Sequence, residues 1–116
     1  MARPGATNAF ANPAASQTDA TLTKEEGGTL AAITNRRIVV LAVFCVAGGT
    51  ATTLTFNSKG SGAGTAITSL IANAANGGIV LNYNERGWFS TNIGETLTVT
   101  TGAGSATGIN VVYKVA

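Results

Sequence analysis

The side chains that most enzymes use for chemistry are scarce in this sequence. It contains no histidine and one cysteine, which excludes histidine-activated nucleophiles, histidine proton shuttles, histidine-containing metal sites and thiolate zinc sites. Paired carboxylates could still perform acid–base catalysis. Glu85 and Glu95 lie in expected turns on either side of residues 88–91 and could approach each other, but solvation or pairing of Glu85 with Arg86 is the simpler explanation. We expect no enzymatic activity, no cofactor and no metal ion. The acidic residues are Asp19, Glu25, Glu26, Glu85 and Glu95.

The glycine-rich stretch at residues 60–64, GSGAG, superficially resembles a phosphate-binding loop. Such a loop needs a Lys-Ser or Lys-Thr pair after its glycines and a helix that opens toward the phosphates. Neither feature follows these glycines in the sequence. We therefore predict a flexible loop.

Aromatic side chains gather in residues 76–97, NGGIVLNYNERGWFSTNIGETL. The Asn-Gly-Gly start allows the positive backbone dihedrals of a tight turn, and residues 84–87 form a second turn before Trp88 and Phe89. Trp88 could plug the core or its rim. Alternatively, Trp88 and Tyr83 could form a sugar-stacking platform or an interaction hot spot, because aromatic residues concentrate the energy of both kinds of contact.

Charge is sparse and scattered along the chain. Only 10% of the residues are charged, against about 25% in ordinary soluble domains. The net charge of +2 comes from seven Lys and Arg residues, of which only Arg36 and Arg37 are adjacent. This distribution is not the footprint of a nucleic-acid-binding protein. It predicts that assembly hides much of the surface, although a threonine-rich exposed β-face would also explain it.

The longest apolar run, residues 38–47, must be the central element. It is about half the length of a transmembrane span, and its β-branched residues and the following Gly48-Gly49 favour a strand. We expect no membrane association. Alternate residues of a strand point to opposite faces, so both faces of this strand are apolar. One can pack into the core, and the other needs cover from a second copy or a larger partner. The expected faces are Ile38, Val40, Ala42, Phe44 and Val46, and Val39, Leu41, Val43, Cys45 and Ala47.

Cys45 and the N-terminal residues indicate the cellular compartment in which the protein is made. Cys45 lies inside the apolar run, where a buried inert thiol is expected and an intermolecular disulfide is the alternative. No apolar segment of seven or more residues follows Arg3 and Pro4, so we expect no export signal. Both features fit synthesis in a reducing cytoplasm, whatever the later destination.

Residues 1–21 differ in composition from the rest of the chain. They hold both prolines, many alanines and a single large apolar side chain, Phe10, which is too little to build a core. We predict an extended N-terminal arm at residues 1–21 and a β-sandwich domain at residues 22–116. The arm could be a frayed tail, or it could order against a partner with Phe10 as its anchor.

From residue 22 onward, short alternating runs are separated by Gly and Asn clusters, as in all-β sandwiches and barrels. We predict an all-β, two-sheet sandwich of about eight strands, with jelly-roll connectivity as one possible arrangement. Gly48-Gly49 would allow a tight hairpin, and residues 65–76 have a helical alternative. Residues 109–115 should close the core with Ile109, Val111, Tyr113 and Val115. The expected strands are residues 29–34, 36–47, 50–58, 65–71, 79–83, 88–91, 96–101 and 109–115.

One ordered set of motifs lies within residues 36–115: NGG, an apolar strand, YN, GWF and a T-x-x-GE turn. This order resembles small all-β virion proteins of tailed bacteriophages, the capsid decoration or cement proteins. The resemblance implies a β-sandwich subunit, commonly a homotrimer, that binds the major capsid protein on the outer shell and ties neighbouring capsomers together. Such proteins often extend a terminal arm across the shell. They share no chemical site, so no residue role transfers to this chain.

We therefore expect a structural virion protein, made in the host cytoplasm, that decorates and stabilises the outer capsid surface as an oligomer. The main alternative is a virion fibre head or other module that binds a host glycan or receptor through Tyr83, Trp88 and Phe89. A small tail or head-completion subunit is a further structural alternative. The candidate interaction residues are Phe10, Val39, Leu41, Val43 and Trp88.

Overall fold

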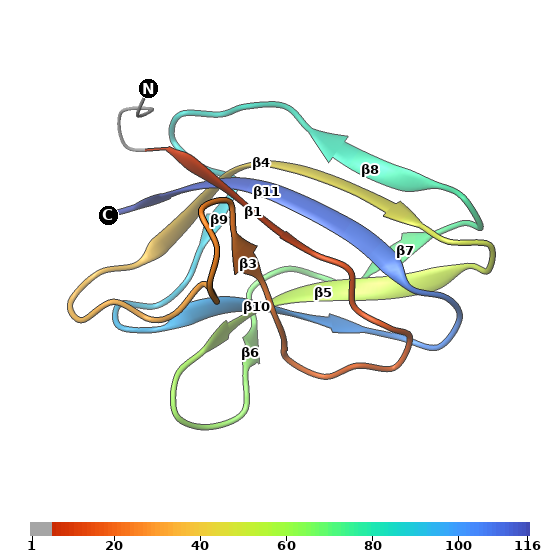
Figure 1. The fold of residues 1–116 in the computed structure, drawn as a ribbon, viewed down its shortest axis with the longest axis horizontal. Helices are drawn as coiled ribbons and strands as arrows, with labels where there is room; N and C mark the ends of the chain where they lie inside the picture. The colour runs from red at the N-terminus through yellow and green to blue at the C-terminus, as the bar shows by residue number, and fades with distance from the viewer. Residues whose placement is uncertain (1–5) are drawn as a thin grey trace.

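A computed structural model describes residues 6–116, which form β-strands and connecting segments without a helix (Figure 1). The strands are β1 (Thr7–Ala11), β2 (Ala20–Thr21), β3 (Thr23–Lys24), β4 (Ile38–Ala47), β5 (Thr52–Lys59), β6 (Thr65–Ala66), β7 (Ile71–Asn73), β8 (Gly78–Leu81), β9 (Phe89–Ser90), β10 (Thr96–Thr101) and β11 (Thr107–Val115). Over this range no helical segment has the length and hydrophobicity that a membrane crossing requires.

The strands form two antiparallel sheets that pack face to face, the upper and lower layers of Figure 1. Sheet A has the order β3-β1-β11-β4-β8, and β9 also pairs with β4. Sheet B has the order β2-β10-β5-β6, and β7 also pairs with β5. The predicted two-sheet β-sandwich is confirmed.

The strand pairs are nested in the order of a jelly roll. The first long strand, β1, pairs with the last, β11, and β2 pairs with β10. Inside these pairs, β4 pairs with β8 and β5 pairs with β7. This nested set, folded over so that alternate pairs fall in different sheets, is the double-sheet jelly-roll arrangement.

The core lies between the sheets and is lined by alternate residues of β5 and β11. Ile109, Val111 and Tyr113 point inward from β11 and are buried, as predicted, whereas the fourth predicted core residue, Val115, is 37% exposed at the end of the strand. Leu54 and Phe56 point inward from β5 and are buried. The rest of the buried apolar cluster comprises Ala9, Ala20, Leu22, Leu30, Ile38, Val40, Val43, Cys45, Leu97 and Val99.

A β-bulge in β4 makes the predicted division of its faces wrong. Val112 of β11 pairs with Ala42, but the next residue, Tyr113, pairs with Val40, so Leu41 is an extra residue in β4. Because a bulge of this kind inserts one residue, it reverses the alternation beyond it. The residues that join the core are Ile38 and Val40 before the bulge and Val43, Cys45 and Ala47 after it.

Several other local predictions are corrected by the structure. Gly48 and Gly49 do not form a hairpin, because β4 and β5 belong to different sheets. Residues 29–34 contain only an isolated bridge at Thr29. The expected strand at residues 65–71 is divided between β6 and β7, and the helical alternative at 65–76 is not adopted.

The extended arm predicted at residues 1–21 is also corrected, for the part that the structure describes. Residues 7–11 form β1, which lies inside sheet A between β3 and β11. Ala9 and Ala20 are buried in the core, and Ala20 belongs to β2 in sheet B. Alanine is large enough at these two positions because the rest of the core is filled by side chains from the neighbouring strands. Residues 1–5 lie outside the described part of the chain.

Candidate interaction surface

Exposed side chains, three of them apolar and one an asparagine, form a row across the outer face of sheet A. Phe10 of β1 pairs with Asn110 of β11, Asn110 pairs with Phe44 of β4, and Phe44 pairs with Val80 of β8. We call these four residues the outer row. Phe44 is 51% exposed and Val80 is 66% exposed. Residues directly opposite on neighbouring strands are side-chain neighbours, so the row forms one continuous strip.

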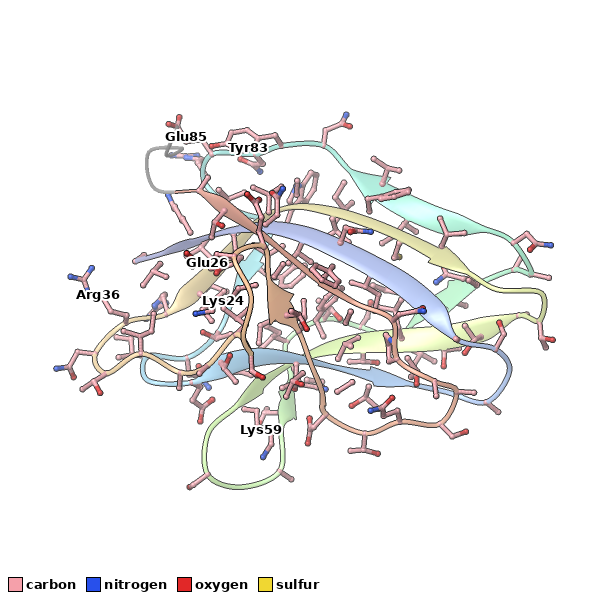
Figure 2. All side chains as sticks on the ribbon, viewed as in Figure 1. Lys24, Glu26, Arg36, Lys59, Tyr83 and Glu85 are labelled. Atoms are coloured by element: carbon pink, nitrogen blue, oxygen red, sulfur yellow. The ribbon has the colours of Figure 1, made fainter. Side chains whose placement is uncertain are left out.

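A groove of about 340 Å³ adjoins the outer row, and no charged side chain lines it. Val112 and Ala42 lie under it, and Tyr83, which is exposed, stands at its side. Figure 2 shows Tyr83 with Glu85 on the segment that follows β8, whereas Lys59 lies at the opposite sheet. The complete lining is Asn8, Ala42, Val43, Phe44, Val80, Leu81, Asn82, Tyr83, Asn110, Val111 and Val112.

Residues 82–88 cover the other half of the outer side of β4. The Asn84 N–H donates to the Leu41 carbonyl and the Trp88 N–H donates to the Val40 carbonyl, both at 2.8 Å. Gly87 has a φ of 91°, and a Cβ at its position would overlap Val39. Because this segment packs so closely, Val39 and Leu41 are buried within the chain itself.

Trp88 holds this covering segment together. Its Nε1 donates to the Asn82 carbonyl at 2.8 Å, while the ring is about half exposed. Phe89 instead turns into the sandwich, where its ring centre lies 5.0 Å from that of Phe56. Phe89 is therefore not part of an exposed aromatic set, whereas Tyr83 and Trp88 are both exposed, so a sugar-stacking role for these two residues stays a prediction.

The five predicted interaction residues fall into two groups. Phe10 and Trp88 are exposed, whereas Val39, Leu41 and Val43 are buried in the single chain. The bulge places Val43 in the core, and residues 82–88 cover the other two. The open positions of β4, Phe44 and Val46, belong to the predicted face that did not supply the interaction residues, and Val80 of β8 is exposed beside them. The period-two pattern could have found them only if the bulge at Leu41 had been known.

The carboxylates of Asp19 and Glu95 are partly buried and accept hydrogen bonds from other segments of the chain. Asp19 accepts hydrogen bonds from Asn57, Thr98 and the Gly64 backbone N–H. Glu95 accepts a 2.6 Å hydrogen bond from the Ser58 hydroxyl. The glycine-rich stretch at 60–64 therefore lies against Asp19. Within residues 6–116, no three His, Cys, Asp or Glu side chains gather in a group that could hold a metal ion.

Cys45 is a free, buried thiol on the core side of β4. Burial raises the pKa of this thiol, an effect partly opposed by the Ile79 backbone and the Asn73 side chain beside it. A thiol that keeps its proton is a poor nucleophile. In the folded chain Cys45 acts as a small apolar residue.

The chain matches no model of a known protein family, and no curated protein sequence matches it.

Proposed function

We propose that this protein is a structural subunit of a bacteriophage virion that attaches to the outer surface of the capsid and stabilises the shell. The observation that carries the proposal is the outer row with its adjoining groove. Together they form an uncharged, largely apolar surface on an otherwise threonine-rich sandwich. Contiguous exposed apolar patches of this kind mark interaction sites in soluble proteins.

Fold and sequence add support of a weaker kind. Jelly-roll sandwiches occur in viral capsids, and also in lectins and cupins, so the fold alone does not select a function. The motif order within residues 36–115 favours the virion among these possibilities, because it resembles capsid decoration proteins.

Stabilisation would come from many small contacts. Burial of an exposed side chain the size of Phe44 or Val80 contributes roughly 1.5–3 kcal/mol, and a stable interface covers about 800 Å² per partner. Copies linked in an oligomer would engage several subunits of the major capsid protein at once, and such multivalent binding is far tighter than a single contact. The shell would then resist heat and the pressure of packaged DNA.

The test compares capsids that lack the protein with the same capsids after purified protein is added back. We expect added protein to raise the temperature at which a fluorescent dye gains access to the packaged DNA. Phe44→Lys should reduce this gain. Leu70→Lys is the matched control, because Leu70 is 67% exposed but lies between β6 and β7 of the other sheet. Equal heat resistance with and without bound protein would refute the proposal.

A further inference from the structure

We infer that the peptide bond between Arg36 and Arg37 is a cleavage site for endoproteases that cut after arginine. The bond lies in the connection between β3 and β4, at the end of the sandwich where β4 begins, and Figure 2 shows Arg36 pointing away from both sheets there. The inference goes beyond the proposed function and does not depend on it, because the outer row lies elsewhere on sheet A.

The backbone before this bond is open to an enzyme. A protease holds its substrate as an extended strand, so the peptide that it cuts must be exposed and free of competing hydrogen bonds. Residues 31–36 are all exposed, and the backbone N–H groups of residues 31–35 donate to no other part of residues 6–116. Exposed segments of this kind are preferred sites of proteolytic nicking.

Few contacts hold the bond itself. The Arg36 carbonyl accepts a hydrogen bond from the Gly94 N–H at 2.7 Å, and Arg37 exchanges two hydrogen bonds of 2.9 Å with Ala116. Gly94 lies in an exposed turn, and Ala116 is an exposed residue that follows β11. Both partners can separate from the segment by local opening that leaves the core packed.

The side chains around the bond suit a protease whose specificity pocket carries a carboxylate. Such a pocket binds the guanidinium group of arginine as an ion pair. The Arg36 side chain is exposed and makes no ion pair or hydrogen bond within residues 6–116, so it is available to the pocket. No acidic residue occurs within residues 31–42, so no neighbouring charge repels the carboxylate of the enzyme.

The other basic residues in the described part of the chain are less accessible to a protease. Three of them belong to strands, whose backbone is already paired: Lys24, Lys59 and Lys114. Arg86 is exposed, but its N–H is hydrogen-bonded within residues 82–88, which pack against β4. A protease that cuts after basic residues should therefore reach the bond after Arg36 before the others.

Cleavage adds one water molecule across the peptide bond. The hydroxyl group joins the Arg36 carbonyl carbon and the hydrogen joins the Arg37 nitrogen, and proton transfer then leaves a carboxylate and an ammonium group. The segment that ends at Arg36 stays bound after the cut. It contributes β1, which lies between β3 and β11 in sheet A, and the buried core residues Leu22 and Leu30.

The cut changes both the stability of the protein and the outer row. Unfolding of a nicked molecule separates two chains, so its melting temperature falls on dilution, whereas that of the intact chain does not. Phe10 then belongs to one chain, and Phe44 and Val80 belong to the other. Loss of the shorter chain would therefore remove part of the interaction surface.

The test is limited digestion of the folded full chain with trypsin, followed by mass spectrometry and gel filtration. We expect the first cut within residues 6–116 to fall between Arg36 and Arg37, and the two fragments to elute together. The double variant Arg36→Gln, Arg37→Gln should lose this cut. Arg86→Gln is the matched control, because it also removes an exposed arginine, and it should be cut after Arg36 as fast as wild type. Thermal melting checks that each variant is folded.

Four outcomes would overturn the inference. The first is a wild-type chain that resists trypsin under conditions that digest the heat-unfolded protein. The second is a first cut after Lys59 or Arg86. The third is an unchanged digestion rate in the double variant. The fourth is complete digestion without a nicked intermediate, which would mean that trypsin attacks the unfolded chain and not this segment.

Discussion

The carboxylate of Asp19 accepts a hydrogen bond from the backbone N–H of Gly64, with 3.0 Å between Oδ2 and the nitrogen. The contact joins segments 45 residues apart and holds the loop after β5 against the chain entering β2. The other carboxylate oxygen accepts from Asn57 and Thr98. Asp19 itself has a φ of 51°, a left-handed conformation that Asp tolerates better than most residues.

Loss of the Asp19 carboxylate should destabilise the fold. Asp19→Ala leaves several donors unpaired, and Asp19→Asn places a donor opposite donors that are already present. We expect each substitution to lower the free energy of unfolding by about 1–3 kcal/mol, measured by urea denaturation. Glu85→Gln is the control, because this side chain is exposed, and it should change stability by no more than about 0.5 kcal/mol. Wild-type stability in Asp19→Ala would show that these bonds contribute nothing net.

A methyl group at Gly78 should also destabilise the protein. The Cβ would overlap the Cys45 carbonyl oxygen in the neighbouring strand β4, and neither strand can move without disturbing the sheet. We expect Gly78→Ala to lower the free energy of unfolding by about 1–3 kcal/mol.

Gly108→Ala provides the matched control for Gly78→Ala. Gly108 lies in β11 of the same sheet, and a Cβ there meets no atom within 4 Å. Thermal melting should show this variant to be as stable as wild type or slightly more stable, because alanine restricts the unfolded chain. If both substitutions lowered the melting temperature equally, the cause would be the loss of a glycine from the sheet and not the overlap with the Cys45 carbonyl.

The inward-facing residues of a strand were predictable from the sequence where its side chains alternate between the two faces without interruption. Ile109, Val111 and Tyr113 follow a period of two, and the structure places all three in the core. The alternation of β4 fails at Leu41, because a ten-residue apolar run gives no polar marker of the extra residue. The outer row therefore contains Phe44, which was not among the predicted interaction residues.

The prediction of an extended arm at the N-terminus was wrong for a different reason. Prediction from composition assumes that a strand needs its own large apolar residues, and β1 has only Phe10, which points outward. Its place in sheet A depends on β3 and β11, which lie 12 or more residues away in the chain, so no local pattern could reveal it. Asp19 and Asn57 likewise come together only through the fold.

Deletion of residues 1–21 should abolish cooperative folding rather than release a free arm. The deletion removes β1, exposes an edge of β11 and takes Ala9 and Ala20 out of the core. Unsatisfied backbone groups along β11 add to this loss. A folded, cooperatively melting 22–116 fragment would instead restore the independent-arm interpretation.

Stability should fall in alkaline solution because of Cys45 and Tyr113. Burial raises the pKa of both groups, and the charges of Glu26 and Glu25 raise that of Tyr113 further. Above about pH 8, where an ordinary thiol begins to ionise appreciably, the unfolded chain therefore releases protons that the folded chain retains. Unfolding is then favoured as pH rises. Each group can contribute up to about 1.4 kcal/mol per pH unit between its unfolded and folded pKa values.

The contribution of each group is measurable from the pH dependence of urea denaturation. Between about pH 8 and about pH 11, a range spanning the ordinary thiol and phenol pKa values, Tyr113→Phe and Cys45→Ala should each show a shallower fall in unfolding free energy than wild type. Below about pH 7, where both groups are protonated in both states, the slopes of wild type and variants should coincide. A thiol reagent should accordingly modify Cys45 rapidly only in denaturant. Rapid modification of the native protein would mean that β4 opens readily beside β8, contrary to the tight pairing of these strands.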